Sequence, residues 1–123
     1  IIRFLRPVIQ ADVQLKSDVI ATVFVAHLKS KNPQFLDSED GRRSDPIVKA
    51  AGKTRSLIIR AAESVALRKM VVDATQNNNQ PVLLFGDLND DLPAVTTEII
   101  AGDEPYRFAK PEDKKIEWDR LLY

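Results

Sequence analysis

The sequence predicts an α/β (α+β) protein in which helices pack against a mixed sheet. Residues 4–15 alternate apolar and polar side chains, and residues 19–26 form a β-branched and aromatic run, as strands do. Residues 57–75 are rich in apolar side chains and contain no Gly or Pro, which indicates a helix, and residues 81–85 form a short apolar strand. Strands interleaved with helices along the chain favour a sheet covered by helices.

The first two strands are expected to form an antiparallel hairpin, because residues 16–18 (Lys-Ser-Asp) are typical turn residues. The second strand should be central, since a continuous apolar run is typical of a strand buried on both faces. Residues 28–56 contain breakers such as Pro46 and Gly52, so they predict a long charged loop. Thr54 is then the expected cap of the following helix.

The second half of the chain predicts three further elements joined by polar segments. Asn residues at 77–79 are expected to end the long helix, and residues 86–91 form a polar loop after the strand at 81–85. A short helix is expected at residues 92–101, with Asp91 near its cap and Gly102 after its end. Residues 116–123 predict a final strand after a charged connection.

Composition bounds the class of protein. The chain has 123 residues, 44% of them hydrophobic, with 18 basic and 18 acidic side chains, so it is long enough for one folded domain, residues 1–123. The absence of Cys excludes disulfide scaffolds, thiol catalysis and Cys-based zinc sites, and a single His excludes a multi-histidine metal cage built from this chain. No apolar run approaches the roughly 20 residues of a membrane span, and no segment assigns a compartment.

Both ends of the sequence lie in apolar, strand-like stretches. We therefore expect residues 1–123 to be part of a longer domain. A partial sheet should expose apolar edges or faces, which would favour self-association into oligomers.

Charge is unevenly distributed along the chain. Residues 42–69 hold eight basic side chains against two acidic ones, whereas residues 87–123 hold ten acidic against five basic. This pattern suits an anionic substrate held beside a cation-binding carboxylate cluster, and it also suits two ordinary solvated faces.

Polar side chains follow two of the predicted strands. His27 ends the second strand, and an imidazole there could exchange a proton with a phosphate oxygen or a leaving group, or be a structural residue. Asp87 and Asn89 follow the strand at 81–85, and they could ligate Mg²⁺ and orient a water, or form a polar turn. We expect the three side chains to converge on one concave face within about 10 Å.

A third polar position lies in the predicted final strand. Asp119 is an acid among apolar neighbours, so it needs a partner, either a histidine that it would orient, or the adjacent Arg120 or the solvent.

Together these segments resemble the endonuclease/exonuclease/phosphatase superfamily, which has the DNase I-like fold. The resemblance runs in the family's order over residues 5–123: HLKS at 27–30, a helix containing Arg60, PVLLFGDLND at 81–90 and EWDRLL at 117–122. It implies a two-sheet sandwich with flanking helices, of which this chain is about half. It also implies hydrolysis of a phosphate ester with Mg²⁺ or Mn²⁺, the substrate being DNA, RNA, a phospholipid such as sphingomyelin, or an inositol phosphate.

The resemblance also implies residue roles. His27 matches the histidine that contacts the scissile phosphate and assists the leaving group. Asp87 matches the acid that activates water near the metal, and Asn89 matches the amide that binds phosphate and steadies this acid; both are candidate metal ligands. Asp119 matches an acid that holds a second catalytic histidine, and Arg60 matches a helix arginine that we count among the substrate-binding residues.

Two functional residues of the family have no counterpart in this sequence. The metal-binding Glu is expected before residue 1, and the second histidine is expected after residue 123, since the chain has one His. The chain alone is therefore expected to be almost inactive.

Two other functions stay open. A non-catalytic module could bind anions or nucleic acid through residues 42–69. A haloacid dehalogenase-type phosphatase is a remote alternative, because GDLND at 86–90 resembles that family's late loop while its early DxDx[TV] nucleophile pattern is absent.

Overall fold

The computed structural model describes residues 3–76, 79–119 and 121–122, and their strands form one mixed sheet. The strands are β1 (Ile9–Lys16), β2 (Val19–His27) and β3 (Val82–Asp87), in the order β1-β2-β3. β1 pairs antiparallel with β2, and β3 pairs parallel with it. The predicted hairpin, the central position of the second strand and the mixed sheet are therefore confirmed, whereas burial of this strand on both faces is wrong, since Val25 is 40% exposed.

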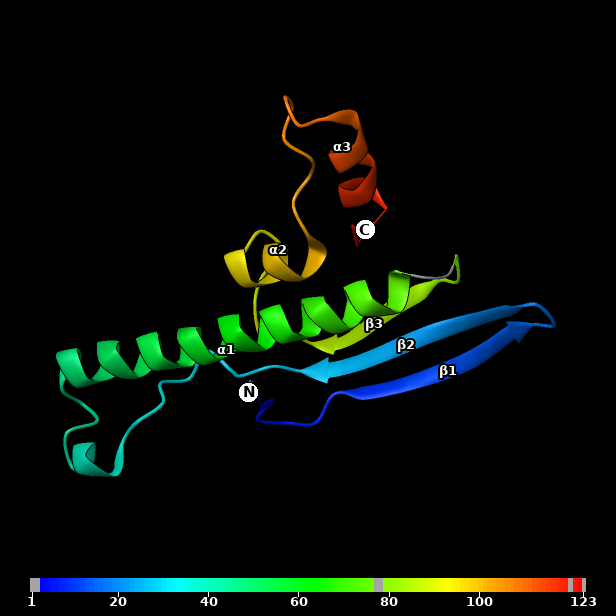
Figure 1. The fold of residues 1–123 in the computed structure, drawn as a ribbon. Coiled ribbons are helices and arrows are strands. Elements are labelled where there is room, and N and C mark those ends of the chain that lie inside the picture. Colours follow the sequence, from blue (N-terminus) through cyan, green and yellow to red (C-terminus); the bar gives the residue numbers. More distant parts are fainter. Residues whose placement is uncertain (1–2, 77–78, 120, 123) are drawn as a thin grey trace.

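The helices lie mainly on one side of this sheet. They are the 3₁₀ turn η1 (Asp37–Glu39), α1 (Pro46–Thr75), α2 (Val95–Ala101) and α3 (Pro111–Trp118). α1 runs along the sheet, and α2 and α3 lie on the side of α1 away from the β1–β2 hairpin (Figure 1). The α+β class is thus confirmed at a coarse level, while the two-sheet sandwich stays a prediction, because the described residues form a single sheet.

The long helix begins well before the predicted boundary. α1 starts at Pro46 rather than at residue 57, so the predicted loop is shorter and Thr54 is not the cap. Asp45 is the N-cap, since its carboxylate accepts hydrogen bonds from two backbone N–H groups of the first turn at 2.8 and 3.1 Å. Pro46 fits the first helical position, where no N–H is needed.

Gly52 lies inside this helix for a packing reason. A Cβ at this position would stand 2.9 Å from Cβ of Pro33, so the close approach of the preceding loop requires a residue without a side chain. Pro46 and Gly52, two of the predicted breakers, therefore belong to α1.

The predicted final strand is wrong. Residues 111–118 form α3, which begins at Pro111 and carries Glu112 and Asp113 in its first turn and Lys115 in its last. The acidic side chains lie at the positive N-terminal end of the helix dipole, and the lysine lies at its negative C-terminal end. Both placements stabilise a helix relative to a strand. α2 starts at Val95, three residues later than predicted, and Gly102 follows its end as expected.

The end of α1 matches its predicted position, with Thr75 as its last residue. Asn77 and Asn78, which were predicted to end it, lie outside the described residues. Within the described part of the chain, no helix combines the length and apolar character needed to cross a membrane.

The core lies between the sheet and the helices. Phe24 and Ala26 on β2, Leu28 beyond it, and Leu67 and Val71 on α1 are at most 2% exposed. Alternation along a strand places Phe24 and Ala26 on the same face of the sheet, which is therefore the face that α1 covers.

The opposite face of the sheet is apolar and uncovered. Strand alternation and register place on it five large side chains that are 38–60% exposed: Ile9, Val13, Val25, Leu83 and Phe85. We call these five residues the bare face. The predicted exposure of apolar sheet surface is confirmed, whereas self-association through it stays a prediction.

Candidate active site

The candidate site is built where β2 and β3 end side by side. His27 and Asp87 are the last residues of these strands and are partners in the parallel register. Nε2 of His27 lies 4.0 Å from Oδ2 of Asp87, and the two side chains are 50% and 64% exposed. This distance is too long for a hydrogen bond but lets both groups contact one water or phosphate oxygen. The predicted proximity of these two side chains is confirmed, while the concave face stays a prediction.

Gly86 fixes the alignment of these two residues. Its φ is +129°, and a Cβ here would stand 1.9 Å from the carbonyl oxygen of Ala26. Only glycine allows β3 to approach β2 this closely, so Gly86 sets the position from which Asp87 projects.

Asn89 joins the site through its backbone and its side chain. Its φ of +55° is tolerated by Asn, and its N–H donates to Oδ1 of Asp87 at 2.8 Å. Its Nδ2 donates to the carbonyl oxygen of Leu28 at 3.0 Å. The backbone N–H of Asn89 therefore steadies Asp87, whereas its side-chain amide, which was expected to do so, ties the loop after β3 to the residue that follows His27.

Arg60 lies beneath the site rather than on its surface. It is 5% exposed, and its Nε donates to Oδ2 of Asp90 at 3.0 Å while its Nη1 donates to the carbonyl oxygen of Lys29 at 3.2 Å. The guanidinium is held by these two partners, so contact between Arg60 and substrate stays a prediction.

Asp90 is the centre of a polar cluster beside the site. Its carboxylate accepts from Oγ1 of Thr96 at 2.6 Å and pairs with Lys31 at 3.0 Å as well as with Arg60. The hydrogen bond from Thr96, followed by those from Lys31 and Arg60, holds the pKa of Asp90 well below its usual value despite opposing desolvation. Asp90 therefore stays ionised and fixes the loop between β3 and α2.

Asp119 is not part of this arrangement in the described residues. It follows α3, its side chain is exposed, and its backbone N–H donates to the carbonyl oxygen of Lys115. Among the contacts of the described part of the chain, none joins its carboxylate to His27 or Asp87. Its placement on a strand is wrong, and its predicted partner Arg120 lies outside the described residues.

A metal could find two protein ligands at the site. The described residues contain no group of three or more His, Cys, Asp or Glu side chains close enough to hold an ion. Asp87 and Asn89 could supply a carboxylate and an amide oxygen. Mg²⁺ usually keeps several waters and binds through one or two carboxylates plus substrate phosphate, so these two ligands fit a hydrated ion shared with a phosphate.

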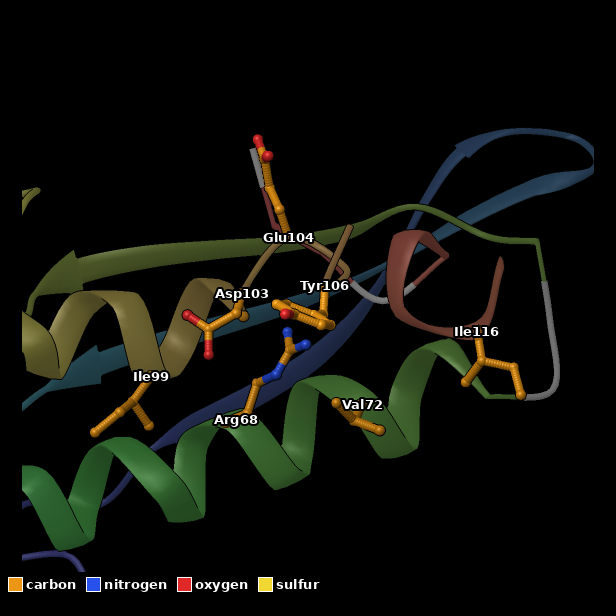
Figure 2. Close-up of a pocket in the computed structure, with 8 residues that line it drawn as sticks. Arg68, Val72, Ile99, Asp103, Glu104, Tyr106 and Ile116 are labelled. Carbon is orange, nitrogen blue, oxygen red and sulfur yellow. The ribbon is translucent and has the colours of Figure 1, made fainter. Parts of the chain in front are cut away.

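A pocket of about 630 Å³ lies elsewhere, between α1 and the α2–α3 connection. Figure 2 shows Arg68 projecting from α1 towards Asp103 and Tyr106. Nη1 of Arg68 donates to the carbonyl oxygens of Ile100 and Ala101 at 3.2 Å, so this arginine binds the end of α2. None of the predicted site residues lines this pocket.

An apolar groove of about 380 Å³ follows β3. Leu83 and Phe85 of the bare face line it together with Leu88, Leu92 and Ile100. The candidate site therefore lies at the end of β2 and β3, and the apolar groove extends from it along the preceding residues of β3.

Sequence reasoning missed one residue that supports the site. Glu63 on α1 is 1% exposed, and its carboxylate accepts hydrogen bonds from the backbone N–H groups of Leu5 at 2.9 Å and Lys29 at 2.7 Å. The available signal was an acid three residues after Arg60 in an otherwise apolar helix segment, because a buried acid needs partners.

Comparison with protein-family models, with curated proteins and with solved structures gives no match for this chain. The family resemblance therefore rests on the sequence motifs alone, and the site rests on its geometry.

Proposed function

We propose that His27, Asp87 and Asn89 form part of a site that hydrolyses a phosphate ester with the help of Mg²⁺ or Mn²⁺. The single observation that supports this proposal is the pairing of His27 and Asp87, 4.0 Å apart at the open carboxyl ends of adjacent parallel strands. Side chains at such strand ends are held rigidly while remaining accessible to a substrate.

Each residue has a role that its position allows. Nε2 of His27 donates a proton to a phosphate oxygen or to the leaving oxygen. Oδ2 of Asp87 orients the attacking water and accepts its proton as the new P–O bond forms and the bond to the leaving oxygen breaks, while Oδ1 accepts the N–H of Asn89, which keeps the carboxylate in place. When bound, Mg²⁺ or Mn²⁺ supplies charge neutralisation for the phosphate, with Asp87 and Asn89 as its protein ligands.

The substrate is a phosphate ester of DNA, RNA, a phospholipid or an inositol phosphate. Binding without catalysis, through residues 42–69, gains less support. Four of the eight basic side chains in this segment, Arg43, Arg55, Arg60 and Lys69, form ion pairs within the chain. Their charge is therefore partly neutralised before any anion binds.

The first test measures binding, because the chain alone is expected to hydrolyse slowly. Mn²⁺ added to ¹⁵N-labelled protein with inorganic phosphate should broaden the amide signals of residues 86–89, since a paramagnetic ion affects nearby nuclei most. Asp87→Ala should abolish this broadening. Asp91→Asn is the matched control, because Asp91 lies in the same loop but pairs only with Lys31 among the described side chains. Equal broadening in wild type and Asp87→Ala would contradict the metal site.

The second test measures hydrolysis of bis(p-nitrophenyl) phosphate, and then of DNA, RNA, sphingomyelin and inositol phosphates, with Mg²⁺ or Mn²⁺. Loss of a positioned acid or base costs about 100-fold, so Asp87→Ala and His27→Ala should each reduce any metal-dependent rate by that order. Asp91→Asn should leave the rate unchanged. Turnover that is the same in all four proteins would remove these residues from the mechanism.

A further inference from the structure

We propose that Glu63 is a positioning residue, which acts with Arg60 to direct His27 towards Asp87. The proposal deepens the proposed function and rests on it, because it concerns the same candidate site. Glu63 is itself too deeply buried, at 1% exposure, to touch a substrate.

The peptide groups that follow His27 are held from α1. Oε2 of Glu63 accepts the N–H of Lys29 at 2.7 Å, and Nη1 of Arg60 donates to the carbonyl oxygen of the same residue at 3.2 Å. Glu63 and Arg60 are three residues apart and so lie on one face of the helix. Both backbone polar groups of Lys29 are therefore fixed by one helical turn.

Leu28, between His27 and Lys29, is held from two other segments. Its carbonyl oxygen accepts Nδ2 of Asn89 at 3.0 Å and Nη1 of Arg6 at 3.1 Å. Its N–H donates to the carbonyl oxygen of Asp87 at 3.0 Å, which extends the β2–β3 ladder by one bond. The two residues after His27 thus have every backbone polar group occupied.

Glu63 joins these contacts to the start of the chain. Its second oxygen, Oε1, accepts the N–H of Leu5 at 2.9 Å, next to Arg6. The hydrogen bond from Lys29 is buried and the one from Leu5 is part-buried, and hydrogen bonds are stronger where water is excluded. One carboxylate therefore orders the backbone of residues 5 and 29, on either side of the chain that presents His27.

The test is Glu63→Gln, which keeps the shape but replaces one acceptor oxygen with an amide nitrogen that cannot accept an N–H. Glu39→Gln is the matched control. Glu39 is also buried, accepts the N–H of Leu36 at 2.9 Å and pairs with an arginine, Arg55, but it lies on η1. Both bonds of Glu39 fall on one oxygen, Oε2, so Glu39→Gln controls for the loss of a buried carboxylate at a site away from His27, whereas Glu63→Gln must lose one of two bonds made by separate oxygens.

The readout is the nuclear Overhauser effect between Hε1 of His27 and the Hβ protons of Asp87, with the imidazole chemical shifts. We expect Glu63→Gln to weaken this effect at least twofold and to move the imidazole signals, and Glu39→Gln to change neither. In any metal-dependent hydrolysis, Glu63→Gln should lower kcat about tenfold with KM unchanged, since misplacement of a catalytic group acts on the chemical step.

Unchanged His27 signals in Glu63→Gln would overturn the positioning role, even if the variant is less stable. If Glu63→Gln does not fold, Arg60→Lys replaces it. Lysine can keep the charge beside Asp90 but lacks the second nitrogen for the carbonyl of Lys29, so the same His27 signals should move, and their constancy would overturn the proposal. The readout needs no activity. Displaced His27 signals together with absent Mn²⁺ and phosphate binding in the wild type would contradict the proposed function and leave the positioning role standing.

Discussion

Two aspartates three residues apart, Asp87 and Asp90, occupy opposite environments. The Asp87 side chain is 64% exposed and lies 4.0 Å from an imidazole, whereas that of Asp90 is 10% exposed and bonds to three side chains. In the segment GDLND they are the same residue type in the same polar stretch. Exposure and hydrogen-bond partners, rather than residue type, therefore distinguish Asp87, which is accessible to a substrate, from Asp90, which holds the loop.

Asn89 is the point at which the two environments separate. Asp87 ends β3 and projects on the side of the bare face, as its register with His27 requires. The left-handed backbone of Asn89, with φ of +55°, then turns the chain, and Asp90 meets Arg60 of α1 and Thr96 of α2. The left-handed conformation of Asn89 therefore leaves Asp87 on the side of the bare face and turns Asp90 towards the helices.

The largest expected effect is on stability, from Asp90→Asn. The substitution leaves the Arg60 guanidinium, 6% exposed, without its anionic partner. Removal of one member of a buried ion pair costs about 3 kcal/mol of the free energy of unfolding. Urea denaturation followed by circular dichroism measures it.

Asp91→Asn is the control for this prediction. Asp91 is 82% exposed and pairs only with Lys31 among the described side chains, so its loss should cost less than about 0.5 kcal/mol. Equal stability of the Asp90→Asn and Asp91→Asn variants would break the distinction between the buried and the exposed acid.

The second expected effect is on the pH dependence of stability. Because the folded state lowers the pKa of Asp90, its contribution is complete above the unfolded value of about 3.8 and is lost as the pH falls below that value. The stability difference between wild type and Asp90→Asn should therefore shrink from pH 4 to pH 2.5, by at most about 1.4 kcal/mol per pH unit.

The difference in the free energy of unfolding between wild type and Asp90→Asn does not contain the contribution of the other acids, because both proteins share it. The pKa of Glu39 is also lowered, mainly by the N–H of Leu36 and then by Arg55, but this effect is common to both proteins. A difference in stability that stays constant from pH 6 to pH 2.5 would show that Asp90 does not titrate in this way.

Local periodicity explains which parts of the fold could be predicted from the sequence. The strands and the middle of α1 carry repeating apolar patterns, so they were found, and His27 and Asp87 followed because they end two of those strands. The first turns of α1 were missed because Pro46 and Gly52 break helices in isolation. Proline is accepted at the first helical position. Gly52 leaves room for the side chain of Pro33, which is distant in the sequence, so this contact could not be predicted locally.

The polar contacts that support the site could not be predicted for a related reason. Glu63 bonds to Lys29, 34 residues away in the sequence, and Arg60 bonds to Asp90, 30 residues away. No local sequence pattern predicts either pair. The final strand was predicted from a few apolar positions, whereas the charges at the ends of α3 favour a helix.

A third prediction concerns the side of the sheet that Asp87 faces. If the bare face mediates self-association, Phe85→Thr should weaken it about tenfold, because about 1.4 kcal/mol of apolar burial is lost per dimer. Sedimentation velocity over a range of protein concentrations measures the association constant. Phe108→Thr is the control, since Phe108 is 77% exposed but lies outside the sheet. An association constant that is equal in both variants would exclude the bare face.

The smallest expected effect is that of Asp87→Asn on stability. The Asp87 side chain is largely solvated, and an Asn side chain can still accept the N–H of Asn89 through its own Oδ1, so the free energy of unfolding should change by less than about 0.5 kcal/mol. The same substitution removes the negative charge that a divalent cation needs, so the broadening of residues 86–89 by Mn²⁺ should disappear. Urea denaturation and the Mn²⁺ titration on one preparation check both halves. Substantial destabilisation would mean that Asp87 supports the loop as Asp90 does, and retained Mn²⁺ binding at normal stability would mean that the charge of Asp87 is not needed to hold the metal.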